Sequence, residues 1–306
     1  MNRSQQFDRG TSAFVAVSFV WGLPYLLIKI ALRGFEPVTI TLVRTALAAL
    51  LLLPIATKRG SLRDVWRCRY GIGLFALAEF IVPWYCIPTA ETRISSTMTA
   101  ILIATVPLVS GFIAITTRRS TLREVKPLGL LIGATGVVIL CGIDTAGLSP
   151  VALVEMGLVV IGYALAPIVI TRYLGDIDSV VVATASLALC ALIYTVPGVV
   201  AVRKVPTVGQ TTALAALAIV CTAVALLLFF TLVHAWGPVR ATIITYVNPA
   251  VASILGVLLL HESFRANMAA GLTLVILGSL YASRPRASTR AHERRAEPAI
   301  QPPSGS

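Results

Sequence analysis

Long, nearly continuous runs of apolar residues, separated by short polar segments, fill most of the chain. An α-helix needs about 20 apolar residues to cross the hydrocarbon core of a bilayer. Membrane barrels instead show alternating segments of about ten residues, a pattern that this sequence lacks. The pattern therefore predicts an all-α integral membrane protein with ten transmembrane helices. The predicted spans are 11–33, 37–57, 69–89, 94–116, 126–143, 149–172, 178–201, 211–233, 238–260 and 265–283.

Composition agrees with a membrane protein. Of the 306 residues, 57% are hydrophobic and 12% are charged, whereas a soluble domain has about 25% charged residues. Disorder is excluded for most of the chain, because it requires low hydrophobicity and high charge. The run at 11–33 is predicted to be a retained helix, since no small-residue cleavage pattern of a signal peptide follows it.

The net charge of +12 is explained by membrane orientation. With the N-terminus in the cytoplasm, most Lys and Arg residues fall in cytoplasmic segments such as 58–69 and 284–295, as the positive-inside rule requires. We therefore expect a multi-pass protein of the plasma (inner) membrane with both termini cytoplasmic. The expected partners are the lipid bilayer and a small-molecule substrate, and no nucleic acid.

The sequence contains a weak internal repeat. Shifting the chain so that Pro107 falls on Pro249 also brings Gly129 onto Gly271 and Gly136 onto Gly278. Because five helices make one repeat, the second copy has the opposite orientation, which is the plan of secondary transporters. The predicted organisation is a short cytoplasmic N-terminus, two five-helix repeats and a disordered basic cytoplasmic tail, at 1–10, 11–143, 149–283 and 284–306.

Several segments resemble the helices of EamA-type transporters, a family of the drug/metabolite transporter superfamily. The segments 21–29, 36–52, 90–112, 118–140 and 237–264 carry this resemblance. It implies ten helices, cytoplasmic termini and export of small metabolites or drugs. The family usually has Glu after both its fourth and its ninth helix; here Glu262 fits the second position, and Ser120 replaces the first.

Charged residues inside the spans are candidates for function, because each costs about 2.5–3.5 kcal/mol at mid-bilayer. Lys29, Arg44 and Glu155 lie at a similar depth, about 9–10 Å below the outer surface. They form a cluster that attracts an anionic group, or Lys29 extends to the interface and Arg44 pairs with a backbone carbonyl. Glu79 is deeper, about 15 Å from the helix end. It binds a substrate ammonium or a coupling proton, or it is a neutral carboxyl hydrogen-bonded between helices.

Aromatic and amide side chains inside the spans complete the predicted substrate site. They form a cage around an organic cation or an apolar group, or they are ordinary packing residues. Together with Lys29, Arg44 and Glu79, the predicted substrate-binding residues are Trp21, Tyr25, Trp84, Tyr163, Tyr246 and Asn248.

Prolines inside the spans remove backbone hydrogen bonds and can kink their helices. We interpret them as hinges for alternating access, with static packing as the alternative. The predicted hinges are Pro24, Pro83, Pro107, Pro167 and Pro249. Gly129 and Gly133 form a GxxxG pattern that permits close helix contact or a dimer, so monomer and homodimer both stay open.

The sequence contains no phosphate-binding loop and no zinc-protease or serine-hydrolase motif, and no metal, cofactor or catalytic residue is predicted. We expect a non-enzymatic secondary transporter that exports amino acids or drug-like solutes by alternating access, driven by proton exchange or by the solute's own gradient. The alternatives are a membrane-embedded enzyme or lipid-handling protein with an unrecognised site, and a channel.

Overall fold

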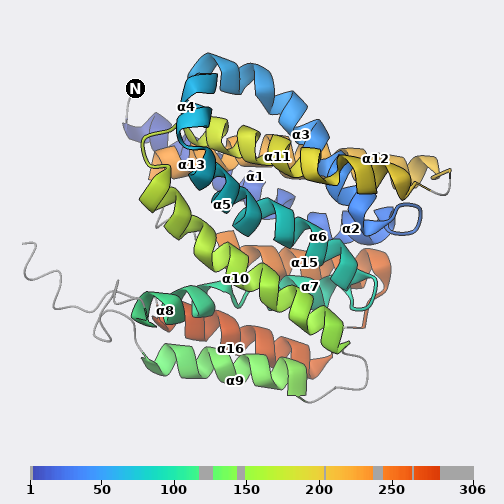
Figure 1. The fold of residues 1–306 in the computed structure, drawn as a ribbon. Coiled ribbons are helices and arrows are strands. Elements are labelled where there is room, and N and C mark those ends of the chain that lie inside the picture. The colour runs from blue at the N-terminus through green and yellow to red at the C-terminus, as the bar shows by residue number, and fades with distance from the viewer. Residues whose placement is uncertain are drawn as a thin grey trace, which may run out of the picture.

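The computed structural model describes residues 3–116, 127–142, 149–202, 205–236, 244–263 and 265–282. Within these ranges all regular structure is helical (Figure 1), which confirms the predicted fold class. The N-terminal half contains α1 (Arg3–Val20), α2 (Pro24–Ala31), α3 (Pro37–Arg59), α4 (Leu62–Arg67), α5 (Arg69–Ala76), η1 (Leu77–Ile81), α6 (Val82–Glu91), α7 (Ser96–Ile103), α8 (Val106–Thr116) and α9 (Pro127–Gly142). The C-terminal half contains α10 (Pro150–Tyr173), α11 (Ser179–Val200), α12 (Val208–Ala218), η3 (Ile219–Val224), α13 (Ala225–Trp236), α15 (Ile244–Leu260) and α16 (Ala266–Ala282).

Each predicted span contains a helix, although not every helix has the length of a span. Within the described ranges, seven helical stretches are long and apolar enough to cross a membrane. The apolar parts of α15 and α16 are shorter, and α9 has 16 residues. The protein therefore has several membrane-spanning helices, and the count of ten stays a prediction.

The most extensive contacts between helices are symmetric: exchanging each helix for its counterpart in the other half gives the same set of contacts. The pairs α3–α11, α7–α15 and α9–α16 each join a helix to its counterpart in the other half. The pairs α6–α10 and α1–α13 exchange with each other. Figure 1 shows the α9–α16 pair side by side at one edge of the bundle. Such a pattern is expected of two repeats related by a twofold axis.

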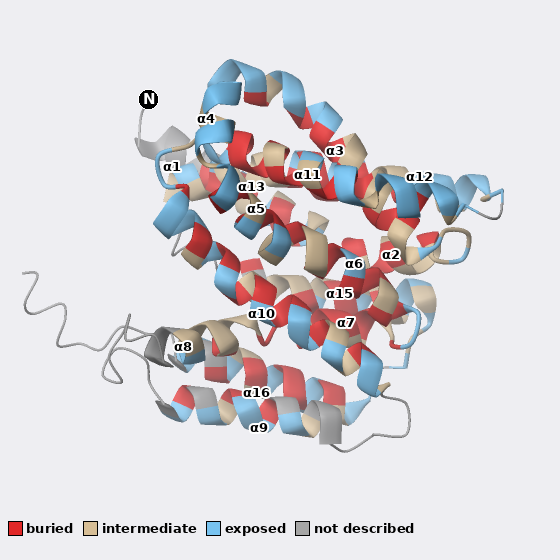
Figure 2. Cartoon of the chain, in the orientation of Figure 1, coloured by how far each residue is buried: buried red, intermediate tan, exposed pale blue. Residues whose placement is uncertain are grey.

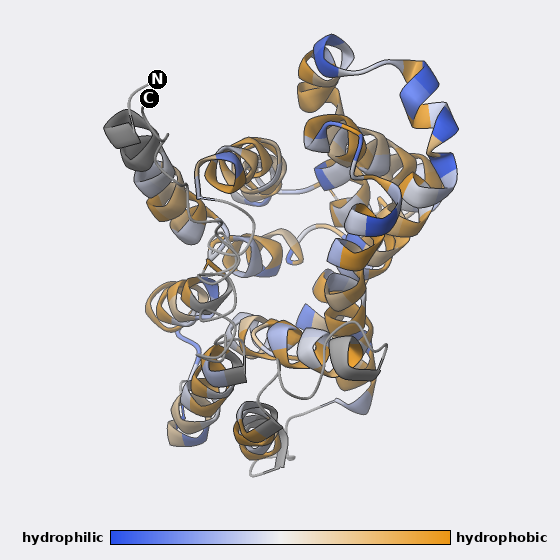
Figure 3. Cartoon of the chain, turned by 90° about the vertical axis from the view of Figure 1, so that its left-hand side faces the viewer, coloured by the Kyte–Doolittle hydropathy of each residue, from blue (hydrophilic) through white to orange (hydrophobic). Residues whose placement is uncertain are grey.

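The outward faces of the helices suit a lipid environment. On α11, Leu192, Val196 and Val200 lie four residues apart, so they share one helix face. Their exposed fractions are 72%, 72% and 75%. Buried residues lie on the opposite, inward faces of α3, α10 and α11 (Figure 2). Hydrophobic residues make up most of the helices, and hydrophilic residues lie mainly near helix ends and connections (Figure 3).

Four of the helical stretches that the structure describes are irregular in their interior. The first span is interrupted at residues 21–23, between α1 and α2, and the fourth at residues 104–105, between α7 and α8. The third and eighth contain the π-helical segments η1 and η3. The chain shift that places Pro107 on Pro249 also places the first residue of η1 on the first residue of η3. The two π-helical segments therefore occupy equivalent positions in the two halves.

One end of the bundle is important for the site, and we call it the distal end. Here α2, α6 and α11 end, and α3, α7, α10 and α12 begin. Capping residues fix two of its helix starts. Ser95 accepts a hydrogen bond from Met98 N at the start of α7, and Thr207 forms a capping box with Gln210 at the start of α12. Such caps satisfy backbone N–H groups that have no partner within the helix.

Candidate functional site

Arg44, in the middle of the bundle, is the centre of the candidate site. Its side chain projects from α3 and is only 7% exposed. The guanidinium carbon lies 3.6 Å from the centroid of the Trp84 ring, and Nε donates a hydrogen bond of 2.9 Å to Thr222 Oγ1. No other hydrogen bond or ion pair to Arg44 occurs among the described residues. The two terminal nitrogens therefore have donors to spare for a ligand.

Trp84 is held in place from several sides. Its indole Nε1 donates a hydrogen bond of 3.2 Å to the Tyr163 hydroxyl on α10, and its ring meets the Phe80 ring edge-on at 4.8 Å. Thr41 Oγ1, on α3, donates to the Trp84 carbonyl at 2.8 Å. Because the ring is fixed, it presents one face to the Arg44 guanidinium in a defined position.

Arg44 joins the two halves through Thr222. Thr222 lies in η3 and donates its own hydroxyl proton to the Leu217 carbonyl at 2.9 Å. This bond spans five residues, in keeping with the wider turn of a π-helix. The hydroxyl oxygen thus faces Arg44 as an acceptor, so Arg44 is positioned by both halves of the chain.

Glu79 belongs to the same region. It lies in η1, and no hydrogen bond or ion pair to its carboxylate occurs among the described residues. Its segment η1 packs against α10, which carries Tyr163, and α2, which carries Tyr25, packs against α6. Arg44 and Tyr163 are therefore linked through Trp84, with Glu79 and Tyr25 on the elements beside them, and all five residues were predicted from the sequence.

The position of Glu79 follows from local backbone chemistry. Pro83 has no N–H and its ring clashes with the carbonyl four residues earlier, which is that of Glu79. The π-helical turn at η1 accommodates this. A Cβ at Gly162 on α10 would lie 2.4 Å from the Ala78 carbonyl oxygen, so Gly162 allows α10 to approach the widened turn.

The remaining charged residues do not join Arg44. Lys29 Nζ donates to the backbone carbonyls of Glu91 and Ile94, the latter at 2.7 Å. Glu155 accepts hydrogen bonds of 3.1 and 3.0 Å from Arg93. The sequence placed Lys29, Arg44 and Glu155 at a similar depth and so suggested that they form a cluster. The structure does not form this cluster, because the order of the helices places a different partner beside each residue.

Trp21 and Asn248 pack elsewhere in the bundle. The Trp21 ring lies 4.8 Å from that of Phe229 in an apolar cluster of α1 and α13. With its amide nitrogen turned toward them, Asn248 donates to the carbonyls of Ser18 at 3.2 Å and Ile244 at 3.1 Å. The Tyr246 side chain and Ser120 lie outside the described residues, as does the tail after residue 282.

The predicted hinge prolines fall into two groups. Pro24, Pro83 and Pro107 are the first or second residue after the break before α2, the segment η1 and the break before α8. Pro167 and Pro249 lie inside the continuous helices α10 and α15. Only the first three thus stand beside an irregular segment.

Glu262 connects the two halves at the distal end. Its carboxylate accepts hydrogen bonds from Ser96 N at 2.8 Å, Ser96 Oγ at 2.9 Å and Thr97 N at 3.0 Å, at the start of α7. His261, at φ 55°, occupies the left-handed region and turns the chain so that Glu262 N donates to Gly256 O, six residues earlier. Burial by itself would raise the pKa of Glu262, but the hydrogen bonds from Thr97 and Ser96 outweigh it and hold the pKa below its ordinary value.

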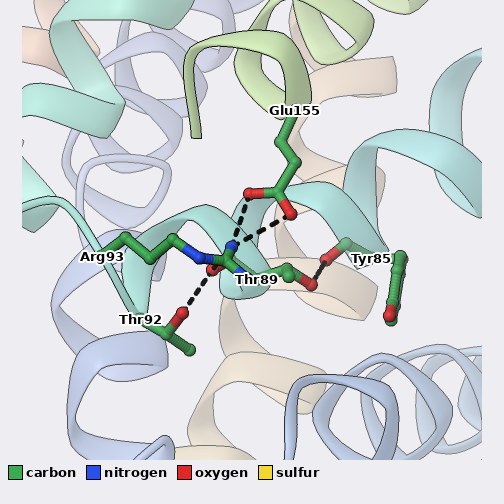
Figure 4. A network of polar contacts seen from close by, with 5 residues as sticks. All are labelled: Tyr85, Thr89, Thr92, Arg93 and Glu155. Carbon is green, nitrogen blue, oxygen red and sulfur yellow. Dashed lines mark hydrogen bonds and ion pairs between the residues drawn. The ribbon is translucent and has the colours of Figure 1, made fainter. Parts of the chain in front are cut away.

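A second polar network lies beside this end (Figure 4). The Arg93 side chain is directed toward the Glu155 carboxylate. One terminal nitrogen of its guanidinium donates both to this carboxylate and to the Thr89 carbonyl, the latter at 3.1 Å. A pocket of about 420 Å³ opens next to it between α3, α6 and α11. The ion pair therefore fixes one wall of this pocket, which is lined by Glu36, Pro37, Val38, Tyr85, Thr89, Thr92, Arg93 and Ala201.

Three residues of these networks were not predicted from the sequence. Thr222 looks like an ordinary small residue in an apolar run, and only its equivalence in the repeat to the Glu79 region distinguishes it. Glu91 and Arg93 fall just beyond the predicted span 69–89 and were interpreted as part of a connection. In the structure α6 continues to Glu91, so the third helix is longer than its apolar run.

The chain is similar to known transporters. The sequence profile described as the EamA-like transporter family matches residues 8–142 and 152–284. YedA of Escherichia coli K12, described as an uncharacterized inner membrane transporter, is 25% identical over 252 residues, covering 80% of each chain. Proteins of the same name from Escherichia coli O6:H1 and O157:H7 match equally well. One solved crystal structure has a TM-score of 0.64 and 17% identity, covering 92% of this chain and 98% of that one, and this likeness concerns the fold alone.

Proposed function

This chain belongs to the EamA-like transporter family, and we propose that it is a secondary transporter that exports small organic solutes carrying an anionic group, such as amino acids. Its membership and its similarity to an inner membrane transporter point to a transporter rather than an enzyme. The substrate, the direction and the mechanism are our proposal.

The observation that carries the proposal is the environment of Arg44. A buried guanidinium is costly unless it is paired, yet Arg44 has one hydrogen bond and the Trp84 ring as its partners among the described residues. Guanidinium groups bind carboxylates in a bidentate geometry. A solute carboxylate would use the terminal nitrogens of Arg44 and offset the cost of burying its charge.

Glu79 supplies the opposite charge in the same region. Arg44 stacks on Trp84, which donates to the Tyr163 hydroxyl, and Glu79 lies five residues before Trp84 in η1, a segment that packs against α10. A zwitterionic solute could place its carboxylate against Arg44 and its ammonium against Glu79, with Trp84, Tyr25 and Tyr163 around its apolar part. This supports amino acids as the first substrate class to test.

Alternating access would use the irregular helices. The breaks before Pro24 and Pro107 and the segment η1 before Pro83 leave backbone groups outside regular helical bonding. In membrane proteins such groups are tolerated where they are buried in protein or face a water-filled cavity. We propose that these three prolines are hinges, that ten helices form two inverted repeats, and that both termini are cytoplasmic.

Transport can be tested with purified protein in liposomes. Preloaded with an unlabelled solute, the vesicles should accumulate the labelled solute by counterflow, and a panel of amino acids, other carboxylates and drug-like cations defines the substrate class. Uptake should saturate, and the recovered label should be chemically unchanged. Non-saturating flux would indicate a channel, and chemical conversion would indicate a membrane enzyme; either result would contradict the proposal.

A further inference from the structure

Glu91 is a fully buried acid that the proposed substrate site does not use. It ends α6 at the distal end and is 0% exposed. Neither carboxylate oxygen has a hydrogen-bond partner among the described residues. This is unusual, because buried polar groups nearly always have a partner.

Charged and titratable groups surround Glu91 on several sides. Lys29 and Tyr25 approach from α2, Arg44 from α3 and Glu262 from the segment after α15. On α10, Glu155 is paired with Arg93. The Lys29 ammonium is bound to the Glu91 backbone carbonyl, and no ion pair to the Glu91 carboxylate occurs in the described part of the chain.

This arrangement favours the neutral acid. A buried carboxylate that has no hydrogen bond, no ion pair and no water is far less stable when ionised than when protonated. Ionisation would therefore require water to enter or Lys29 to leave its carbonyl partners. Both changes mean opening the distal end.

The same contacts hold the distal end closed. Glu262 ties the C-terminal half to the start of α7, and Lys29 ties α2 to the end of α6 and to residue 94. Ser96 and Thr97, next to these contacts, are 1% and 0% exposed. Glu91 thus lies behind a layer of contacts that must separate before water can reach it.

We propose that Glu91 is a proton-binding site that controls the distal opening: this end closes only when Glu91 is neutral, so closing takes up a proton from the distal water and opening releases it. The inference rests on the proposed transport function, since it assigns a step of alternating access. It predicts that low pH favours the closed state. It does not require a proton to cross the membrane.

A thiol-accessibility experiment tests this without a known substrate. In a chain with its five native cysteines replaced by Ser, a single cysteine is placed at the buried Ile94 or at the exposed Thr92. The labelling rate by a membrane-impermeant maleimide is measured in proteoliposomes from pH 5 to pH 8. The ratio of the Ile94→Cys rate to the Thr92→Cys rate removes the pH dependence of the thiol itself. We expect this ratio to rise with pH, by at most about tenfold per unit for one proton.

Three variants decide the role of Glu91. Glu91→Gln should give a low ratio that no longer changes with pH, whereas Glu91→Asp should restore the response. Glu36 is an exposed acid at the same end. In Glu36→Gln the labelling ratio should depend on pH as it does in the unmodified chain. A ratio that is flat in the unmodified chain, or that still rises with pH in Glu91→Gln, would overturn the inference. If Glu91→Gln does not fold, the inference is tested by the unmodified chain and Glu91→Asp, and a labelling ratio that does not rise with pH in either of them would overturn it.

Counterflow measured on the same variants separates the two proposals. With equal pH on both sides, Glu91→Gln should still exchange solute, with a rate that no longer depends on pH. No exchange by the unmodified chain for any solute would contradict the transport proposal and leave the accessibility result intact. Exchange that keeps its normal pH dependence in Glu91→Gln would contradict the role of Glu91 alone.

Discussion

The Arg44 guanidinium stacks on the Trp84 ring, 3.6 Å from its centroid, and reaches across to Thr222 at 2.9 Å. The Trp84 ring belongs to the N-terminal half of the chain and the Thr222 hydroxyl to the C-terminal half. They fix the position of a buried cation without neutralising it, which suits a site that binds an anionic group reversibly.

The first prediction concerns the shape of the Arg44 side chain. Arg44→Lys keeps the charge but loses the planar group that stacks on Trp84 and donates in parallel. A cation–π contact is worth about 0.5–2 kcal/mol, so we expect the KM for counterflow to rise about tenfold, and Arg44→Gln to abolish counterflow. Arg63→Gln, on the short helix α4, is the matched control. Wild-type kinetics in Arg44→Gln would exclude Arg44 from the substrate site.

The second prediction concerns Glu79. Glu79→Gln preserves the size of the side chain and its place in η1, and removes its ability to carry a negative charge or exchange a proton. We expect counterflow to be lost while the purified protein keeps its helical circular dichroism and elutes as a single species in detergent. Full transport activity in this variant would show that Glu79 has only a packing role.

The third prediction concerns the close contact of α10 with η1. In Gly162→Ala the added Cβ would lie 2.4 Å from the Ala78 carbonyl oxygen, which cannot move away as a flexible side chain could. Overpacking of this kind costs about 1–3 kcal/mol, so thermal unfolding in detergent should shift to lower temperature. Gly157→Ala on the same helix is the control, because nothing lies within 4 Å of its added Cβ. Equal stability of the two variants would contradict the packing seen here.

The fourth prediction concerns Glu262 and pH. The pKa of Glu262 is lower in the folded protein than its ordinary value of 4.5. A lowered pKa contributes stability that is complete above the unfolded value and is lost as pH falls through the folded one. We expect Glu262→Gln to lower the thermal midpoint at pH 7, and the difference from wild type to disappear as the pH falls below 4.5. A difference that does not change with pH would mean that the charge of Glu262 is unimportant.

The fifth prediction concerns the Arg93–Glu155 pair in Figure 4. The side chains are 39% and 16% exposed, so solvent screens their attraction, and exposed ion pairs typically contribute 0.2–1 kcal/mol. In a double-mutant cycle with Arg93→Gln and Glu155→Gln, we expect a favourable coupling energy of about 0.2–1 kcal/mol. Additive effects of the two substitutions would show that the pair contributes nothing to stability.

The sequence by itself determined the membrane class, the helical fold and the family. Apolar length is a local property, and a helix satisfies its own backbone hydrogen bonds, so runs such as 37–57 and 178–201 indicate helices without knowledge of their neighbours. The shift that relates Pro107 to Pro249 likewise anticipated a repeat, whose η1 and η3 segments now align.

Only the tertiary structure decided which side chains meet. From membrane depth alone, the sequence could not decide whether Glu155 faces Arg44 or Arg93. The depth of a residue follows from its position along a helix, whereas its partner depends on how the helices are ordered and rotated. Thr222 and Glu91 were missed for the same reason: a hydroxyl in an apolar run and an acid at a helix end acquire a role only through what packs against them. The irregular turn at η1 also depends on a neighbour, Gly162, whose missing side chain makes room for the Ala78 carbonyl.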